Sequence, residues 1–265
     1  AFTVPVGPTE MRGGRGRGVF SNGRNNPNYY STMGYVEIAT TGNTSDFGDT
    51  SNAINGGSGN VSSSTRGLIA GGYKGSPGAN ISHIDYYIFS SSGGASDFGD
   101  LFEISNTHGG VSNNSRGIYG ASTGNVSNFG SLIARSVASS GGINSPTRGI
   151  HIGIDVGGTS KKRTEYVTID SKGNSEEFGE LTVRRTGQGG CSSSTRGLSM
   201  GGLNPTVLGV IDYCTIATLG NFIDFGDLTT SRRSGASCSS STRGLYGGGT
   251  TPSNKNIIDY VTIAS

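Results

Sequence analysis

The sequence "CSSSTRGLYGGG", residues 238–249, has the composition of a flexible linker, yet a large part of it recurs elsewhere in the chain. "CSSSTRGL" also stands at residues 191–198, and "SSSTRGL" at residues 62–68. Self-similarity at a fixed spacing is typical of repeat architectures, in which each repeat is one small unit of packed structure. We therefore expect this phrase to form the inner part of each repeated unit, with glycines that serve close backbone approach and not flexibility.

Two short markers define the period of the repeat. Arg-Gly pairs begin at Arg17, Arg66, Arg116, Arg148, Arg196 and Arg243, with steps of 49, 50, 32, 48 and 47 residues. Phe-Gly pairs begin at Phe47, Phe98, Phe129, Phe178 and Phe225. Each of these phenylalanines precedes the next arginine of the first set by 18 or 19 residues. Because the two markers keep a constant phase, the chain contains a true repeat of about 48 residues.

A third element lies between the two markers and alternates with period two. It reads "GYVEI" at 34–38, "IDYYIF" at 84–89, "EYVTI" at 165–169, "IDYCTI" at 211–216 and "IDYVTI" at 258–263. Such alternation of β-branched and aromatic residues is typical of half-buried strands. The element is absent from the third unit, residues 115–131, where Arg-Gly and Phe-Gly are 13 residues apart. This unit is expected to be reduced by about one hairpin.

These patterns predict an all-β fold, since no segment sustains a helical period. Four short strands in each unit of about 48 residues are typical of a β-propeller blade. We predict a single propeller domain over residues 1–265, with six blades favoured and the third one reduced; five blades are the alternative. The chain stops after "IDYVTIAS", where other units continue into "DFGDL". The N-terminal strand is therefore expected to complete the last blade and close the ring.

The composition excludes several classes of function. A formal net charge of +2 on 265 residues is too small to favour nucleic acid or an anionic membrane as partner. No apolar run has the roughly 18 residues of a membrane span, and the N-terminus has no signal-peptide pattern. The three cysteines contain no CxxC pair, which argues against a disulfide framework or a zinc site. Cys191 and Cys238 share one repeat phase and are expected to be buried packing residues.

The combination of "TRGL..GG" with "IDY.TIA..GN..DFGDL" resembles the kelch-type propeller repeats of tailed-phage structural proteins, notably phages of marine cyanobacteria. The matching positions are Gly71-Gly72 with Tyr86 and Phe98, Gly201-Gly202 with Tyr213 and Phe225, and Gly248-Gly249 with Tyr260. Phenylalanine replaces the usual kelch tryptophan, and the chain has no tryptophan. The resemblance implies a virion component at the particle surface. A copper oxidase also occurs on kelch folds, but His83, His108 and His151 lie at unrelated repeat phases, so no cofactor is implied.

No residue set in the sequence predicts catalysis. The "DFG" aspartates Asp46, Asp97 and Asp224 recur in several units, so they are expected to cap tight turns beside a core aromatic ring. Paired acids in "DFGD" leave calcium as a weaker alternative. No Ser-His-Asp or Cys-His combination shares a repeat phase. We therefore predict that the protein is not an enzyme, with no catalytic residue and no metal site.

The six arginines of the Arg-Gly marker are expected to form a ring related by the repeat. Each guanidinium can tie blades together by donating hydrogen bonds to backbone carbonyls or to the "DFGD" carboxylates. Binding of an anion near the axis is the alternative. The third unit has Asn128 and Ser131 where the others have acids. Arg116 is therefore predicted to be the unpaired member of the ring.

The segments that follow the glycine-ended strands vary most between units. "RNNPNYYSTM" at 24–33 and "YKGSPGANISH" at 73–83 carry tyrosines and lysine, and Tyr29, Tyr30, Tyr73 and Lys74 are the predicted contact residues. These variable segments are expected to share one face of the propeller. The favoured function is a non-enzymatic virion or appendage protein that binds other virion proteins, a host cell-surface receptor or a glycan through that face. A purely structural spacer or homo-oligomerisation module is the alternative, and a secreted carbohydrate-active propeller is the third hypothesis.

Overall fold

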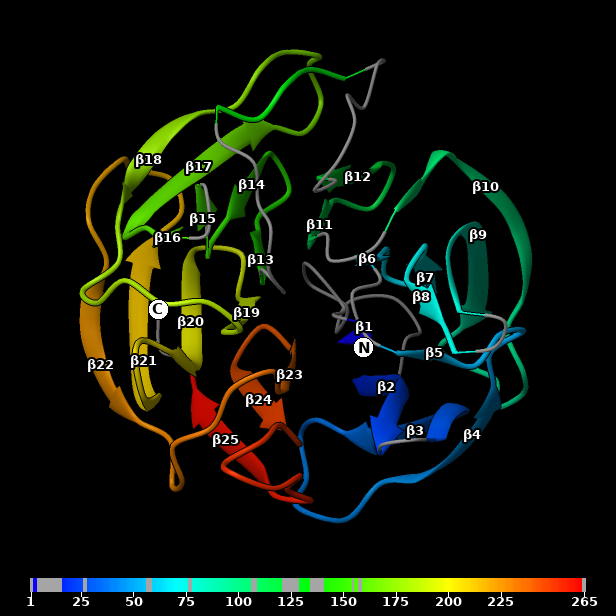
Figure 1. The fold of residues 1–265 in the computed structure, drawn as a ribbon. Coiled ribbons are helices and arrows are strands. Elements are labelled where there is room, and N and C mark those ends of the chain that lie inside the picture. The colour runs from blue at the N-terminus through cyan, green and yellow to red at the C-terminus, as the bar shows by residue number, and fades with distance from the viewer. Residues whose placement is uncertain are drawn as a thin grey trace.

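The structure is a computed structural model, and it describes residues 2–3, 16–25, 28–55, 59–75, 78–105, 109–120, 129–133, 141–153, 155–156 and 159–263. Every regular element in these ranges is a β-strand, which confirms the all-β prediction. The described residues contain no helix of the length and apolarity that a membrane span requires. The sheets stand around a common centre like the blades of a propeller (Figure 1).

Among the described residues, five sheets have three or more strands. The first contains β1 (Phe2–Thr3), β2 (Arg17–Asn25), β3 (Asn28–Glu37) and β4 (Ser45–Asp49). The second contains β6 (Gly59–Ser62), β7 (Arg66–Ala70), β9 (Ala79–Ile88) and β10 (Ser96–Ser105), with β5 (Ile54–Asn55) and β8 (Tyr73–Lys74) added beside β9. The third contains β13 (Gly142–Asn144), β14 (Arg148–His151), β17 (Arg163–Thr168) and β18 (Glu176–Glu180). The fourth contains β19 (Gly189–Ser192), β20 (Arg196–Leu203), β21 (Val207–Thr215) and β22 (Ile223–Asp227). The fifth contains β23 (Ala236–Ser239), β24 (Arg243–Gly247) and β25 (Ile258–Thr262).

The reduced third unit forms a smaller sheet. Its strands β11 (Gly109–Ser112) and β12 (Gly117–Gly120) pair only with each other, and residues 121–128 of this unit lie outside the described residues. A second two-stranded sheet, β15 (Asp155–Val156) with β16 (Thr159–Ser160), lies beside the blade of β13. Counting only sheets of three or more strands, the five-bladed alternative fits the described residues.

Neighbouring strands of each blade are antiparallel and run in order from the centre to the rim (Figure 1). In the blade of β19–β22, the marker glycine Gly197 lies opposite Cys214 and Leu198 lies opposite Tyr213. The hydrophobic core lies between blades, because Phe178 and Leu181 of one blade pack with Phe222 of the next. Phe178 of the Phe-Gly marker thus contributes to this inter-blade core, whereas the equivalent Phe98 is 52% exposed.

The N-terminal strand does not pair where the sequence predicted. Phe2 and Thr3 lie opposite Phe20 and Val19, so β1 forms the inner edge of the first blade. The inner edge of β2 offers the same unpaired backbone groups that inner strands cover in the other blades, and it is nearest in sequence. Closure of the last blade by this strand is therefore not confirmed. Side chains join last to first blade instead: Arg243 Nη1 donates to the Ile38 carbonyl at 3.1 Å.

Candidate functional site

The serines of the repeated phrase form a belt of hydrogen bonds between inner strands. The Ser239 hydroxyl donates to the Ser192 carbonyl at 2.8 Å and accepts from the Ser192 amide at 3.2 Å. Ser192 makes the same two bonds to Asn144, and Ser112 makes them to Ser62. These hydroxyls are buried, so each one satisfies two backbone groups that water cannot reach. Within the described residues, the belt ties each unit from the third to the last to the one before it in the chain.

The residues that follow these serines in the repeated phrase make contacts both within and between units. Ser193 Oγ accepts from the Arg196 amide at 3.0 Å and fixes the turn between the two inner strands. In the third unit Asn113 replaces this serine and accepts from the Arg116 amide through its side-chain oxygen. A Cβ atom on Gly197 would lie 2.3 Å from the Ile143 side chain of the preceding blade. The phrase is therefore a set of contacts between units, and its glycine is required by close approach.

Four of the six marker arginines reach the following unit through backbone carbonyls. Arg17, Arg116, Arg148 and Arg243 donate from Nη1 to the carbonyls of Phe89, Ile169, Ile216 and Ile38, at 3.1, 2.8, 2.6 and 3.1 Å. Each acceptor ends the alternating "Tyr" strand of the next unit. Five of the six guanidinium groups also lie over the tyrosine of their own unit: Arg17 on Tyr35, Arg66 on Tyr86, Arg148 on Tyr166, Arg196 on Tyr213 and Arg243 on Tyr260, at 4.5 to 4.8 Å.

The prediction that Arg116 is unpaired is wrong. Its partner is the carbonyl of Ile169, and a backbone acceptor is present whatever the side chains of the reduced unit are. Among the described residues, the ring arginines make no hydrogen bond or ion pair with a "DFGD" carboxylate; the carboxylate that Arg17 contacts is Glu37, at 3.1 Å on the adjacent strand. The "DFG" aspartates were expected to cap tight turns, but they lie at β-bulges within the outer strands β4, β10 and β22. There Asp46, Asp97 and Asp224 accept from the amides of Gly48, Gly99 and Gly226 at 2.9 to 3.1 Å.

Sequence reasoning missed a second set of contacts, in which the acid of "IDY" accepts bonds from the preceding blade. Asp212 accepts from the amide and the hydroxyl of Thr182 at 3.2 and 2.5 Å, and forms an ion pair with Arg185 at 2.9 Å. Both charged side chains are fully buried. Desolvation lowers the pKa of Arg185, and the neighbouring Asp212 carboxylate opposes that shift.

The same arrangement recurs one repeat later. Asp259 accepts from the amide and hydroxyl of Thr229 and pairs with Arg232 at 3.0 Å. Arg185 and Arg232 both lie seven residues after the phenylalanine of a Phe-Gly marker. That phase, together with a Thr four residues after the same phenylalanine, is the sequence signal that identifies these inter-blade pairs.

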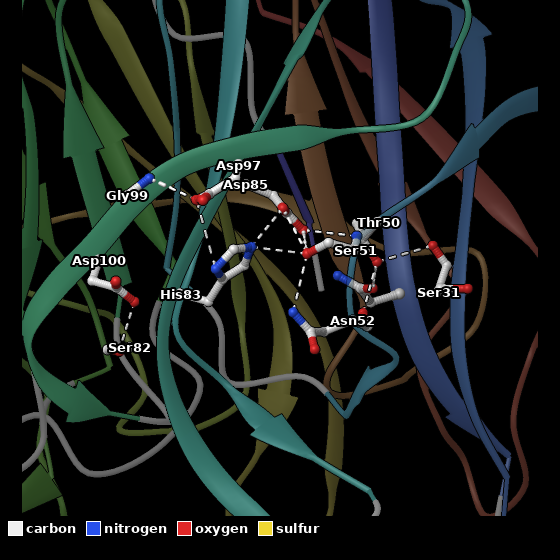
Figure 2. Close-up of polar contacts among 11 residues, drawn as sticks. Ser31, Thr50, Ser51, Asn52, Ser82, His83, Asp85, Asp97, Gly99 and Asp100 are labelled. Atoms are coloured by element: carbon white, nitrogen blue, oxygen red, sulfur yellow. Dashed lines mark hydrogen bonds and ion pairs between the residues drawn. The ribbon is translucent and has the colours of Figure 1, made fainter.

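One junction replaces the buried arginine with a histidine (Figure 2). Asp85 accepts from the Ser51 hydroxyl at 2.8 and 2.9 Å, and His83 Nε2 lies 3.0 Å from Asp85 and 2.9 Å from Ser51 Oγ. His83 Nδ1 lies 3.7 Å from the exposed Asp97 carboxylate. The structure thus assembles a serine, a histidine and two aspartates that no common repeat phase predicted.

The geometry of this cluster is that of an inter-blade contact. A nucleophilic serine needs a histidine nitrogen that accepts its proton, with the carboxylate on the other ring nitrogen. Here Ser51 and Asp85 share one nitrogen, the serine donates to the carboxylate, and Asp97 is beyond hydrogen-bond distance. The hydroxyl-to-acid bond also matches Thr182–Asp212, where no histidine is present. Among the described residues no group of three His, Cys, Asp or Glu side chains is arranged to hold a metal, so the calcium alternative gains no support.

Two of the predicted contact residues lie together. The segments expected to be loops are hairpin extensions: Tyr29 and Tyr30 belong to β3, and Tyr73 and Lys74 form β8. The Tyr29 and Tyr73 rings, from neighbouring blades, are 6.4 Å apart, and the Arg24 guanidinium lies 5.7 Å from the Tyr29 ring. Tyr30 is 40% exposed and follows Tyr29 directly, so it points to the opposite face of the strand. Lys74 is half-buried opposite Ile54.

The three cysteines are buried and unpaired. Burial raises the pKa of Cys191 and of Cys214 to about 12, and it raises the pKa of Cys238 as well. Thiols with such pKa values stay protonated and unreactive at neutral pH.

Comparison with models of known protein families and with curated proteins finds no match for this chain.

Proposed function

We propose that this chain is a non-enzymatic binding scaffold, a structural or appendage component of a phage virion. In this proposal the two hairpin extensions that carry Tyr29, Tyr30, Tyr73 and Lys74, together called the hairpin face, bind another virion protein or a host-surface ligand. The observation that carries the proposal is the Tyr29–Tyr73 ring pair, which two neighbouring blades contribute with Arg24 beside it. Aromatic and cationic side chains on a rigid β scaffold are the usual contact groups of binding surfaces.

The use of polar groups elsewhere supports a scaffold over an enzyme. The Ser51–His83–Asp85 cluster, the Arg185–Asp212 pair and the marker arginines are engaged in contacts between units. A catalytic group has to be presented to substrate, whereas the hydroxyl of Ser51 is bonded to a buried carboxylate. The spacer or oligomerisation alternative would use the same contacts and leave the hairpin face without a ligand.

The finer description of the fold belongs to the same proposal. We infer that the propeller contains six kelch-like repeat units. The third unit, which includes residues 115–131, is reduced. Support comes from Ser112 of β11, which joins the hydroxyl belt, and from Arg116 before β12, which reaches the next unit as Arg17, Arg148 and Arg243 do. The assignment to a phage virion rests on the sequence resemblance alone, and the location at a particle surface follows from that assignment.

A glycan array probed with the fluorescently labelled chain tests the host-ligand form of this function. Retention on defined glycans should fall at least about fivefold for Tyr73→Ala and for Tyr30→Ala, since each removes an aromatic contact worth about 1 kcal/mol or more. Tyr260→Ala is the matched control, because Tyr260 is 57% exposed on β25, in a different blade.

A map of the assembled particle by cryo-electron microscopy tests the partner-protein form. The proposal expects the hairpin face either free toward solvent or seated on another virion protein through Tyr73. A chain that binds no glycan and whose hairpin face touches nothing in the particle, while its rim contacts neighbours, would favour the spacer alternative.

A further inference from the structure

Seven consecutive connections between strands, all at one end of the propeller, carry positive charge and no acid. Neighbouring strands of each blade are antiparallel, so the connection after each second strand and the one after each outer strand leave the blade at the same end. In order around the ring, from the connection after β18 to the one after β7, these segments contain seven Lys and Arg residues and no Asp or Glu: residues 181–188, 204–206, 228–235, 248–257, 24–28, 50–58 and 71–78.

Backbone hydrogen bonds join three of these connections. The amide of Ser234, after β22, donates to the carbonyl of Gly187, after β18, at 2.7 Å. The amide of Arg233 donates to the carbonyl of Thr250, after β24, at 3.2 Å, and its carbonyl accepts from the Thr250 amide at 2.9 Å. The connections that carry Arg184 and Arg233 therefore adjoin, and both of these side chains are exposed.

Contacts between side chains continue this surface across the next two blades (Figure 1). Asn254 Nδ2 donates to the Arg24 carbonyl at 3.4 Å, which joins the connection after β24 to the β2–β3 hairpin. The Arg24 guanidinium lies 5.7 Å from the Tyr29 ring, and the ring centroids of Tyr29 and Tyr73 are 6.4 Å apart. Lys74 follows Tyr73 in β8. A single line of contacts thus runs from the connection after β18 to β8.

Two of the seven cations are neutralised inside the fold, because Arg185 pairs with Asp212 and Arg232 pairs with Asp259. The arginines among the other five are exposed and the lysines are half-buried. We call these five residues the basic arc: Lys74, Arg24, Lys255, Arg233 and Arg184. Its two lysines, Arg184 and Arg233 make no ion pair with any described residue. The arc therefore holds uncompensated positive charge.

Exposed acids stand instead on the outer strands of the blades. β4, β10, β18 and β22 carry the paired acids of the repeat: Asp46, Asp49, Asp97, Asp100, Glu177, Glu180, Asp224 and Asp227. The formal net charge of +2 therefore hides a separation between basic connections and acidic outer strands. A nucleic-acid duplex or a lipid bilayer is wide enough to meet charges of both signs, whereas a thin chain that follows the arc meets positive charge alone.

Polar and aromatic side chains suited to sugars accompany the cations. Tyr30 on the β2–β3 hairpin is 40% exposed and offers an apolar ring with a polar hydroxyl. Four asparagines on the same connections are exposed, and the amide group of each can both donate and accept hydrogen bonds: Asn25, Asn28, Asn254 and Asn256. This set of groups matches a ligand that carries hydroxyls as well as negative charge.

We propose that the basic arc binds an acidic polysaccharide, a single chain of sugars that bears carboxylate or sulfate groups. The arginines and lysines pair with these anions, the asparagines bond to hydroxyls, and Tyr30 and Tyr73 pack on the apolar faces of sugar rings. The inference names a ligand class for the hairpin face, and it rests on the function proposed for that face in its tyrosine contacts. Arg184, Arg233 and Lys255 extend the site beyond the hairpin face.

Fluorescence anisotropy of labelled oligosaccharides, titrated into the full chain, tests this inference. A heparin fragment supplies sulfate groups, an oligogalacturonate supplies carboxylates, and a dextran fragment of similar length is the neutral control ligand. Saturable binding of at least one acidic probe is expected, with dextran at least about tenfold weaker, because the neutral sugar gains nothing from the cations.

The triple variant Arg184→Ala/Arg233→Ala/Lys255→Ala should weaken the binding of the acidic probe by about tenfold or more. Each exposed charge contact contributes about two- to fivefold, and alanine keeps the backbone bonds of these connections. Lys172→Ala is the matched control for Arg184→Ala, because it removes an exposed cation from the turn before β18, at the opposite end of the blade. Circular dichroism shows whether each variant is folded.

Three outcomes would overturn the inference. They are a folded chain that binds neither acidic probe or binds dextran equally well, a folded triple variant that binds as the parent does, and tighter binding of a single-stranded oligothymidylate, which would make nucleic acid the ligand. The two proposals fail separately. Equal affinity for dextran and acidic probes that falls in Tyr73→Ala would refute the ligand class alone. Acidic binding that falls in the triple variant and not in Tyr30→Ala or Tyr73→Ala would refute the hairpin-face function and leave the arc.

Discussion

Replacement of the buried Arg185 by alanine should be among the most damaging single substitutions in the chain. The guanidinium is fully buried, lies 2.9 Å from Asp212 and donates from Nη2 to the carbonyl and hydroxyl of Ser199 at 3.2 and 3.0 Å. Its removal leaves the Asp212 carboxylate buried with Thr182 as its remaining partner. Breaking a buried ion pair from one side costs about 3–5 kcal/mol. The free energy of unfolding should fall by that amount.

The neighbouring Arg184 provides a matched control because it is exposed. Arg184→Ala should change the free energy of unfolding by no more than about 0.5 kcal/mol, as surface substitutions usually do. Urea titrations followed by circular dichroism measure both variants, since the chain has no tryptophan for fluorescence. The double variant Arg185→Met/Asp212→Leu should cost less than the two single truncations together, because it removes both charges. Equal costs for Arg184→Ala and Arg185→Ala would refute the reasoning. If Arg185→Ala does not fold, the double variant still tests it: failure of both to fold would show that the charge is not the cause.

Three further predictions concern a histidine, a glycine and the cysteines. Burial lowers the pKa of His151 from its ordinary 6.5 to about 4, so on acidification the unfolded state takes up a proton at a higher pH than the native state does. The free energy of unfolding should therefore fall by about 3 kcal/mol as the pH drops from above 6.5 to 4. His151→Gln should flatten that part of the urea-derived stability profile, and an unchanged profile would contradict the assignment. Gly197→Ala should cost about 1–3 kcal/mol in urea unfolding because its Cβ meets Ile143, whereas Gly173→Ala, with open space around it, should be near neutral; equal costs would exclude close packing at Gly197. A thiol reagent such as DTNB should label none of the three cysteines in the native protein and all three in guanidinium; rapid native labelling would show that the inter-blade core opens.

The repeat made much of the fold predictable from sequence. Constant phase between Arg-Gly and Phe-Gly predicted equivalent units, and period-two alternation in "IDYVTI" predicted strands, because both follow from local geometry. The inner position of the repeated phrase in each blade was predicted as well, but no role was predicted for its serines. Ser192 bonds to Asn144, 48 residues away, and such a bond depends on how units stack.

The contacts that sequence reasoning missed or misassigned depend on the neighbouring unit. The partner of Arg116 is a backbone carbonyl, which no side-chain pattern reveals. The partner of Asp212 is Arg185, which lies 27 residues earlier in the chain, in the preceding blade. Arg185 lies outside the Arg-Gly, Phe-Gly and "IDY" motifs that define the repeat. The pairing of the N-terminal strand depended on a choice between two open edges, β2 and β25, that alternation alone does not resolve. The Tyr29–Tyr73 pair was predicted as residues of one surface, whereas its formation by two hairpin extensions was not.

An experimental crystal structure of the full chain tests most directly the central claim that the repeated phrase builds contacts between units around a ring. We expect the Ser239 hydroxyl on the Ser192 backbone, and the Arg243 guanidinium on the Ile38 carbonyl where the last blade meets the first. Serines that face solvent, or an Arg243 that reaches no neighbouring unit, would contradict the claim.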